Sequence, residues 1–292
     1  MKQEHLFWLR FALRIQHPFT SRKTMQVMLP LRQKLEAKLG RGEKLLAIFL
    51  TAGYPEPAAT LPLLDTLVEA GADLIELGVP FSDPLADGPT IQMASQKALA
   101  AGITLTQVLL CAKEFCSARA TPLLLMGYAN PFMQMGWKKV IAAAAEAGVS
   151  GFIIPDLPPE ESDFLQNDLA AARLDLIHLI SPNTTAERIE RINALTRSFV
   201  YAVSVTGVTG ARAQLPLEAE RFLQRLKAQV AHPVLLGFGV SQPETARRAA
   251  QLCEGVIIGS AVIERIAAAP DLVSAQKNAF EFVSAVKRAL NS

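Results

Sequence analysis

The chain has 292 residues, of which 50% are hydrophobic and 19% are charged; 29 Lys and Arg residues against 27 Asp and Glu residues leave a net charge of +2. This composition excludes an intrinsically disordered chain, which combines low hydrophobicity with high net charge, and it provides no strong positive field for binding nucleic acid. Charged residues interrupt the apolar stretches before they reach the roughly 18 residues of a membrane span, so no transmembrane helix is predicted.

The first 28 residues differ in composition from the rest of the chain. Positions 1–24 carry five Lys and Arg residues against one Glu, and apolar residues cluster at positions 6–13. We expect residues 1–28 to form a weakly ordered N-terminal extension; the alternative is a basic amphipathic segment that lies on a membrane surface. The folded domain then spans residues 29–292 and begins with an extra helix that ends at Leu39, before Gly40.

Short apolar runs then alternate with amphipathic segments along the whole chain. The amphipathic segments, such as 57–70, 136–147 and 185–195, carry apolar residues at helical spacing. The apolar runs are continuous, as expected for parallel strands buried on both faces. There are eight of them, at 45–51, 73–79, 122–128, 151–154, 174–180, 199–205, 233–237 and 255–258.

Eight strands, each followed by a helix, predict an α/β fold with a single (β/α)8 TIM barrel. The alternative is a doubly wound open sheet, which would need a Gly-rich turn after the first strand. The segment 51–55 (TAGYP) is not such a turn. Active sites of barrels lie at the carboxyl ends of the strands, so the informative residues are those that end each apolar run.

Glycine-rich turns follow the last three apolar runs, at 206–210 (TGVTG), 237–240 (GFGV) and 259–260 (GS). Glycines let backbone N–H groups approach an anion closely, and a helix N-terminus adds partial positive charge. These turns therefore predict a phosphate site, although they would also suit tight turns alone. No Lys or Arg lies within them, so backbone donors would bind the phosphate.

A carboxylate lies within the second apolar run, at Glu76, and an acidic loop follows at 80–89 (PFSDPLADGP). A buried carboxylate must be paired, protonated or functional, because an isolated buried charge is costly. Glu76 is therefore a candidate general acid and base whose pKa is raised by desolvation. In the stiff loop, Asp87 is a candidate substrate contact, whereas Asp83 fits a turn better.

The three cysteines, Cys111, Cys116 and Cys253, are too few and too scattered for a disulfide framework or a metal site. We expect buried thiols, no metal ion and a cytoplasmic, reducing environment. No lysine ends a strand, as a Schiff-base aldolase would require, and His178 alone among the histidines lies within a strand, as a core or rim residue.

The stretch 76–92 (ELGVPFSDPLADGPTIQ) resembles the signature of the tryptophan synthase alpha subunit family. The resemblance extends over about 43–270, whereas 1–24 has no counterpart. Val205 and Thr206 stand where some members have Arg and Ala, which affects loop detail alone. Further segments match in order: 49–55 (FLTAGYP), 127–131 (GYANP), 151–161 (GFIIPDLPPEE), 204–210 (SVTGVTG), 237–241 (GFGVS) and 258–261 (IGSA).

This resemblance implies a lyase of tryptophan biosynthesis that cleaves indole-3-glycerol phosphate, by a retro-aldol reaction, to indole and glyceraldehyde 3-phosphate. The catalytic pair of the family falls on Glu76 and Asp87. By the same resemblance, Phe49 and Tyr201 would flank the indole, and Thr209 would contact Asp87 on loop closure. The phosphate would be bound by the remaining substrate-binding positions, which are Gly210, Phe238, Gly239, Gly259 and Ser260.

The resemblance also implies a partner. The family's beta subunit holds pyridoxal phosphate and receives the indole in an αββα heterotetramer, while the alpha chain needs no cofactor of its own. The loops 80–85 and 128–136 would face this partner. The second loop carries Phe132, Met133 and Met135 in a stretch expected to be irregular and exposed; the alternative is that Phe132 and Met135 pack onto the barrel.

Two other functions remain possible on the sequence. An enzymatically idle barrel that only activates a partner would be free to lose Glu76 or Asp87, and this chain keeps both. Another barrel enzyme acting on a phosphorylated sugar, such as an isomerase, would explain the phosphate site. It would not explain the loop 80–89.

Overall fold

The computed structural model describes residues 31–203, 217–237 and 239–292. The predicted extension 1–28 and the predicted site residues Thr209, Gly210 and Phe238 lie outside these ranges, as do Val205 and Thr206. Nine parallel strands form one sheet in the order β5-β4-β3-β2-β1-β9-β8-β7-β6. They are β1 (Leu45–Thr51), β2 (Leu74–Gly78), β3 (Leu123–Met126), β4 (Gly151–Ile153), β5 (Asp175–Ile177), β6 (Leu179–Ile180), β7 (Val200–Val203), β8 (Val234–Gly237) and β9 (Gly255–Ile258).

The sheet closes into a barrel at His178. The predicted strand 174–180 is divided there: β5 pairs with β4, whereas β6 pairs with β7 on the other side. The Tyr201 N–H donates to the carbonyl of His178 at 3.4 Å, at the point where the pairing changes partner. One bent segment therefore supplies both edges of the sheet. This break is why nine observed strands correspond to eight predicted ones, and the predicted barrel is confirmed.

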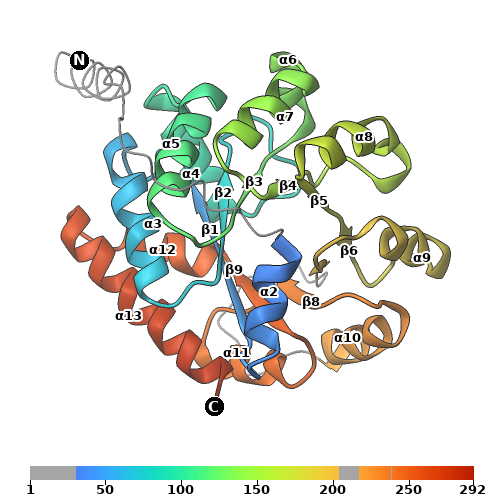
Figure 1. Cartoon of the computed structure of the whole chain (residues 1–292). Coiled ribbons are helices and arrows are strands. Elements are labelled where there is room, and N and C mark those ends of the chain that lie inside the picture. Colours follow the sequence, from blue (N-terminus) through green and yellow to red (C-terminus); the bar gives the residue numbers. More distant parts are fainter. Residues whose placement is uncertain (1–30, 204–216, 238) are drawn as a thin grey trace.

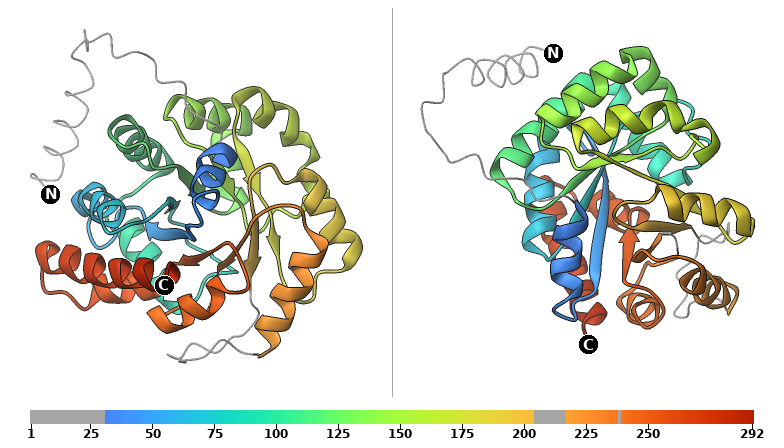
Figure 2. Two further views of the ribbon diagram at one scale, coloured as in Figure 1. Left: turned by 60° about the horizontal axis from the view of Figure 1, so that its bottom comes forward. Right: turned by 45° about the vertical axis from the view of Figure 1, so that its right-hand side comes forward.

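Helices follow the strands and pack outside the sheet (Figure 2), and the C-terminal helix α13 packs against α3, α11 and α12. The predicted helical segments 57–70, 136–147 and 185–195 are confirmed as α3 with a short 3-10 turn, α7 and α9. The elements are α2 (Leu31–Leu39), α3 (Thr60–Glu69), α4 (Pro89–Ala100), α5 (Leu105–Ala118), α6 (Ala129–Met135), α7 (Trp137–Glu146), α8 (Asp163–Ala172), α9 (Ala186–Leu195), α10 (Leu217–Gln229), α11 (Pro243–Ala250), α12 (Ser260–Ala267) and α13 (Leu272–Leu290), with 3-10 turns at Pro57–Ala59 and Pro159–Glu161.

In the described ranges, no single helix is long and apolar enough to cross a membrane. Only α4 and α5 taken together meet that length and composition, and the two are bent by 101°.

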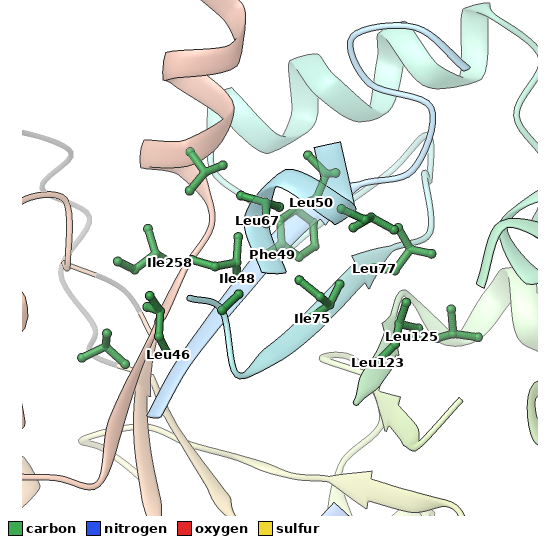
Figure 3. Close-up of a cluster of buried hydrophobic side chains, with 14 of the residues drawn as sticks. Leu46, Ile48, Phe49, Leu50, Leu67, Ile75, Leu77, Leu123, Leu125 and Ile258 are labelled. Atoms are coloured by element: carbon green, nitrogen blue, oxygen red, sulfur yellow. The ribbon is translucent and has the colours of Figure 1, made fainter. Parts of the chain in front are cut away.

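Apolar side chains form two layers that share the strands. Along β1, Ile48 and Leu50 belong to the layer between the sheet and the helices, whereas Leu45 and Ala47 belong to the cluster inside the barrel. Figure 3 shows part of the outer layer, where Ile48 and Leu50 lie near Leu67 of α3. Both faces of each strand are thus buried, which accounts for the continuous apolar runs in the sequence.

The amino end of the barrel is closed by α2. Leu31 and Leu35 of this helix are buried in the cluster inside the barrel, and Figure 1 shows α2 lying in front of the strands. The buried carboxylate of Asp73 accepts hydrogen bonds from Lys38 of α2 at 2.5 Å and from Lys287 of α13 at 2.6 Å. These ion pairs hold both helices at the amino end of the barrel. A functional site is therefore expected at the carboxyl end of the strands.

The segment 128–136 is not irregular, and the prediction that Phe132 is exposed there is wrong. The segment forms α6, in which Pro131 stands in the first turn, where proline is tolerated, and the helix ends at Gly136. Phe132 is fully buried and packs edge-on against Phe152 of β4, 5.6 Å between ring centroids. Met133, on the outer face of the same helix, is 61% exposed.

Candidate functional site

A cavity of about 530 Å³ lies at the carboxyl end of the strands. Every predicted site residue that the structure describes lines it, from elements far apart in the sequence. Its wall also includes residues that the sequence did not indicate, among them Met126, Leu179 and Arg265. The predicted residues on the wall are Phe49, Glu76, Asp87, Tyr201, Gly239, Gly259 and Ser260.

Glu76 reaches the cavity from the middle of β2. Its side chain has no solvent-exposed surface, and neither carboxyl oxygen has a hydrogen-bond partner among the described residues. Burial raises the pKa of this carboxyl from 4.5 to about 8, because no neighbouring charge compensates the loss of water. Glu76 is therefore protonated at neutral pH, in the form that can donate a proton.

Asp87 lies in the loop between β2 and α4, half-buried at the cavity wall. Burial raises the pKa of its carboxyl to about 6, against a hydrogen bond from the Tyr128 hydroxyl that lowers it. The two carboxyl groups thus lose their protons at different pH, and between about 6 and 8 Asp87 is ionised while Glu76 is not. Such a divergence of two carboxyl pKa values is typical of acid–base sites.

Tyr128 holds the loop that carries Asp87, and the sequence did not single it out. Its hydroxyl accepts a hydrogen bond from the Ala86 N–H at 2.9 Å and donates one to Asp87. The ring stacks on Phe81 at the start of the loop, with 5.3 Å between centroids. The sequence feature that could have identified Tyr128 is its position in the segment 127–131, directly after β3. By contrast, Asp83 accepts from Ser82 and is exposed, as expected for a turn residue.

Two aromatic rings line the cavity at places where glycine leaves room for them. Phe49 of β1 stands opposite Glu76 in the strand register. Tyr201 of β7 lies over Gly237, where an added Cβ would come within 2.3 Å of the ring. Burial raises the pKa of Tyr201 well above its ordinary value, and the charges of Glu76 and Asp87 raise it further.

The predicted phosphate site lies where α12 begins. Gly239 has a φ of +80°, a conformation that favours glycine, and Gly259 is the N-cap residue of α12. Ser260 opens that helix, so backbone N–H groups at its start point toward the cavity end of the strands. The arrangement suits a phosphate monoester held by neutral donors.

Charged side chains from the second turn of α12 also line the cavity. Arg265 stacks on Phe282 of α13, 3.6 Å from the ring centroid, and burial lowers its pKa. Glu264 accepts a hydrogen bond from Thr90, in the first turn of α4, at 3.2 Å. The Gly-rich turns contain no cation, as the sequence states, yet the helix behind them brings Arg265 to the same cavity.

The described wall of this cavity lacks the side chains that a Schiff-base aldolase or a metal-dependent aldolase would use. No lysine lines it, and no three His, Cys, Asp or Glu side chains in the described ranges are grouped so that they could hold a metal ion. His178 is buried away from the cavity, and burial lowers its pKa to about 4. The described lining therefore offers the carboxylic acids of Glu76 and Asp87, the charged pair Glu264 and Arg265 on α12, two aromatic rings and the backbone donors at the start of α12.

Comparison with known proteins gives one consistent result. The family model described as "Tryptophan synthase alpha chain" matches residues 35–291. The tryptophan synthase alpha chain of Azoarcus sp. is 45% identical over 89% of this chain and 95% of its own length. That of Dechloromonas aromatica is 48% identical over 81% and 88%. The crystal structure of tryptophan synthase subunit alpha from Legionella pneumophila superposes with a TM-score of 0.83 at 37% identity, covering 89% of this chain and 97% of that one.

Proposed function

Because the chain belongs to the tryptophan synthase alpha chain family, we propose that the cavity at the carboxyl end of its barrel is the active site, with Glu76 and Asp87 as the catalytic pair. The chain is a carbon–carbon lyase of tryptophan biosynthesis, which cleaves indole-3-glycerol phosphate to indole and glyceraldehyde 3-phosphate. The observation that carries the site assignment is the pair of carboxyl groups with pKa values near 8 and near 6 in one cavity.

Glu76 performs the proton transfers. Cleavage requires C3 of the indole ring to become a leaving group, and a proton added to C3 gives an indolenine cation. The protonated Glu76 carboxyl donates that proton. The resulting carboxylate then accepts the proton of the adjacent glycerol hydroxyl, the C–C bond breaks, and its electron pair returns to the ring. Indole and the aldehyde are released, and Glu76 is protonated again.

Asp87 stabilises the charge that develops on the ring nitrogen. Its carboxylate, ionised above a pH of about 6, accepts a hydrogen bond from the indole N–H. The Tyr128 hydroxyl donates a hydrogen bond to Asp87 and accepts one from the Ala86 N–H. These two hydrogen bonds hold Asp87 in place before the substrate binds. A preorganised acceptor of this kind is worth about 10²- to 10³-fold in rate.

The remaining residues bind and orient the substrate. Phe49 and Tyr201 enclose the indole, while Gly239, Gly259 and Ser260 present backbone donors to the phosphate. Phosphate binding, remote from the bond that breaks, positions the reacting end. Thr209, Gly210 and Phe238, which lie outside the described residues, complete the site.

The partner of this chain is a tryptophan synthase beta subunit, and the assembly is an αββα heterotetramer in the cytoplasm. The beta subunit carries the pyridoxal phosphate that consumes the indole. Leu85, 93% exposed in the loop after β2, and Met133, on α6 after β3, offer apolar side chains on neighbouring elements for this contact. The free thiols of Cys111, Cys116 and Cys253, the second of them only half-buried, suit a reducing compartment.

The direct test is an assay of the purified chain with indole-3-glycerol phosphate, in which indole and glyceraldehyde 3-phosphate are both quantified. The proposal expects the two products in equal amounts, and faster release when a beta subunit is added. Absence of indole in both conditions would refute it. Activation of a beta subunit without any cleavage would instead support the idle barrel.

A further inference from the structure

Gly78 is the last residue of β2, two positions after Glu76 and on the same face of the strand. Its backbone does not adopt the left-handed conformation that favours glycine, so the chain geometry there admits other residues. The reason for a glycine at this position must therefore lie in its surroundings.

Those surroundings are the ring of Phe49. A Cβ added at Gly78 would lie 2.5 Å from Cζ and 2.7 Å from Cε2 of Phe49, closer than two carbon atoms can approach. On the other side of β1, a Cβ at Gly259 would lie 3.2 Å from Cβ and Cδ1 of the same residue. The Phe49 side chain thus runs from Gly259 to Gly78, across the ends of the two strands that flank its own.

The open space beside the ring of Phe49 is the cavity that this residue lines. Ile48 and Leu50, its neighbours on β1, are fully buried in the outer apolar layer. Phe49 lines the cavity of about 530 Å³, whereas Gly78 does not. We therefore expect a side chain at position 78 to displace the ring toward the cavity, which Tyr201 also lines.

We infer that Gly78 is a specificity-determining residue of this enzyme: by lacking a side chain it keeps the Phe49 ring against the barrel wall and sets the width of the site for a planar bicyclic aryl group. The inference rests on the proposed function of the cavity. One methyl group misplaced in an apolar pocket changes substrate discrimination about 10- to 200-fold. We expect Gly78→Ala to raise KM for indole, in the reverse reaction with glyceraldehyde 3-phosphate, at least about tenfold.

A double-mutant cycle with Phe49→Leu tests the contact. Leucine lacks Cζ and Cε2, the two atoms that the new methyl group would meet. Gly78→Ala should therefore raise KM for indole at least about tenfold in the wild-type background and leave it almost unchanged in the Phe49→Leu background. An equal rise in both backgrounds would overturn the inference.

Gly127→Ala is the matched control. It also adds a methyl group at a strand end, but there the new Cβ meets Val79 at 2.9 Å and Phe132 at 3.1 Å instead of the cavity wall. Its effect on KM for indole should be the same in both backgrounds; a Phe49-dependent effect of this control would contradict a contact specific to Gly78.

Folding gives a second readout. If Gly78→Ala alone does not fold, recovery of a cooperative urea transition in the double variant supports the contact, and failure in both backgrounds overturns it. Failure of the proposed function is distinguishable, because the wild-type chain would then release no indole from indole-3-glycerol phosphate.

Discussion

The buried carboxyl of Glu76 should make the stability of the protein fall as pH rises. The folded chain keeps this proton up to a pH of about 8, whereas the unfolded chain loses it near 4.5. Unfolding therefore releases a proton between these two values, and the free energy of unfolding decreases across that window. At 1.36 kcal/mol per unit, the whole shift corresponds to about 5 kcal/mol.

The perturbation that isolates this effect is Glu76→Gln, which keeps the size of the side chain and removes its ionisation. Urea denaturation of both proteins at pH 5 and at pH 8.5 gives the difference in free energy of unfolding at each pH. We expect the wild type to lose about 4 kcal/mol relative to the variant between these two values.

Other titrating groups act equally in both proteins and cancel in this difference. A difference that stays constant from pH 5 to pH 8.5 would refute the reasoning. It would mean that Glu76 ionises at its ordinary pKa in the folded chain, and that it is not held protonated for the reaction.

Three further predictions concern the loop, the phosphate site and the partner. Tyr128→Phe should raise the pKa of Asp87 further above 6, because a hydrogen bond that lowers it is lost; a carboxyl chemical shift titration measures this, and an unchanged pKa would contradict the assigned contact. Gly239→Ala should raise KM for phosphorylated substrates and leave KM for indole unchanged, since a side chain is strained at a φ of +80°; equal changes in both would remove this residue from the phosphate site. Met133→Asp should weaken beta-subunit binding in ultracentrifugation at constant basal cleavage, whereas Phe132→Ala should cost about 3–5 kcal/mol in urea unfolding; the reverse pattern would contradict the burial of these side chains.

The strand-and-helix pattern was sufficient to predict the barrel and the residues at its strand ends. Continuous apolar runs identify strands buried on both faces, and a barrel brings their carboxyl ends together whatever their distance in sequence. Glu76 is recognisable on this basis alone, because a carboxylate amid buried apolar residues needs a reason to be there. The described glycines of the proposed phosphate site follow from the same topology.

Contacts between side chains of different loops could not be predicted in the same way. The hydrogen bond from Ala86 to Tyr128 joins residues 42 positions apart and depends on how α6 leaves β3. Phe132 was misjudged because a short helix was read as an irregular loop, and an apolar residue in a loop gives no sign of which way it faces. The role of Gly78 depends on the position of one ring, which no periodicity encodes.

The central claim, that Glu76 and Asp87 form the catalytic pair, is tested most directly by single-turnover release of indole from indole-3-glycerol phosphate by the wild type, Glu76→Gln and Asp87→Asn. The account predicts no detectable release by Glu76→Gln and release at least about 100-fold slower than wild type by Asp87→Asn, while both variants still bind the phosphorylated substrate. Release by Glu76→Gln at the wild-type rate would contradict the account.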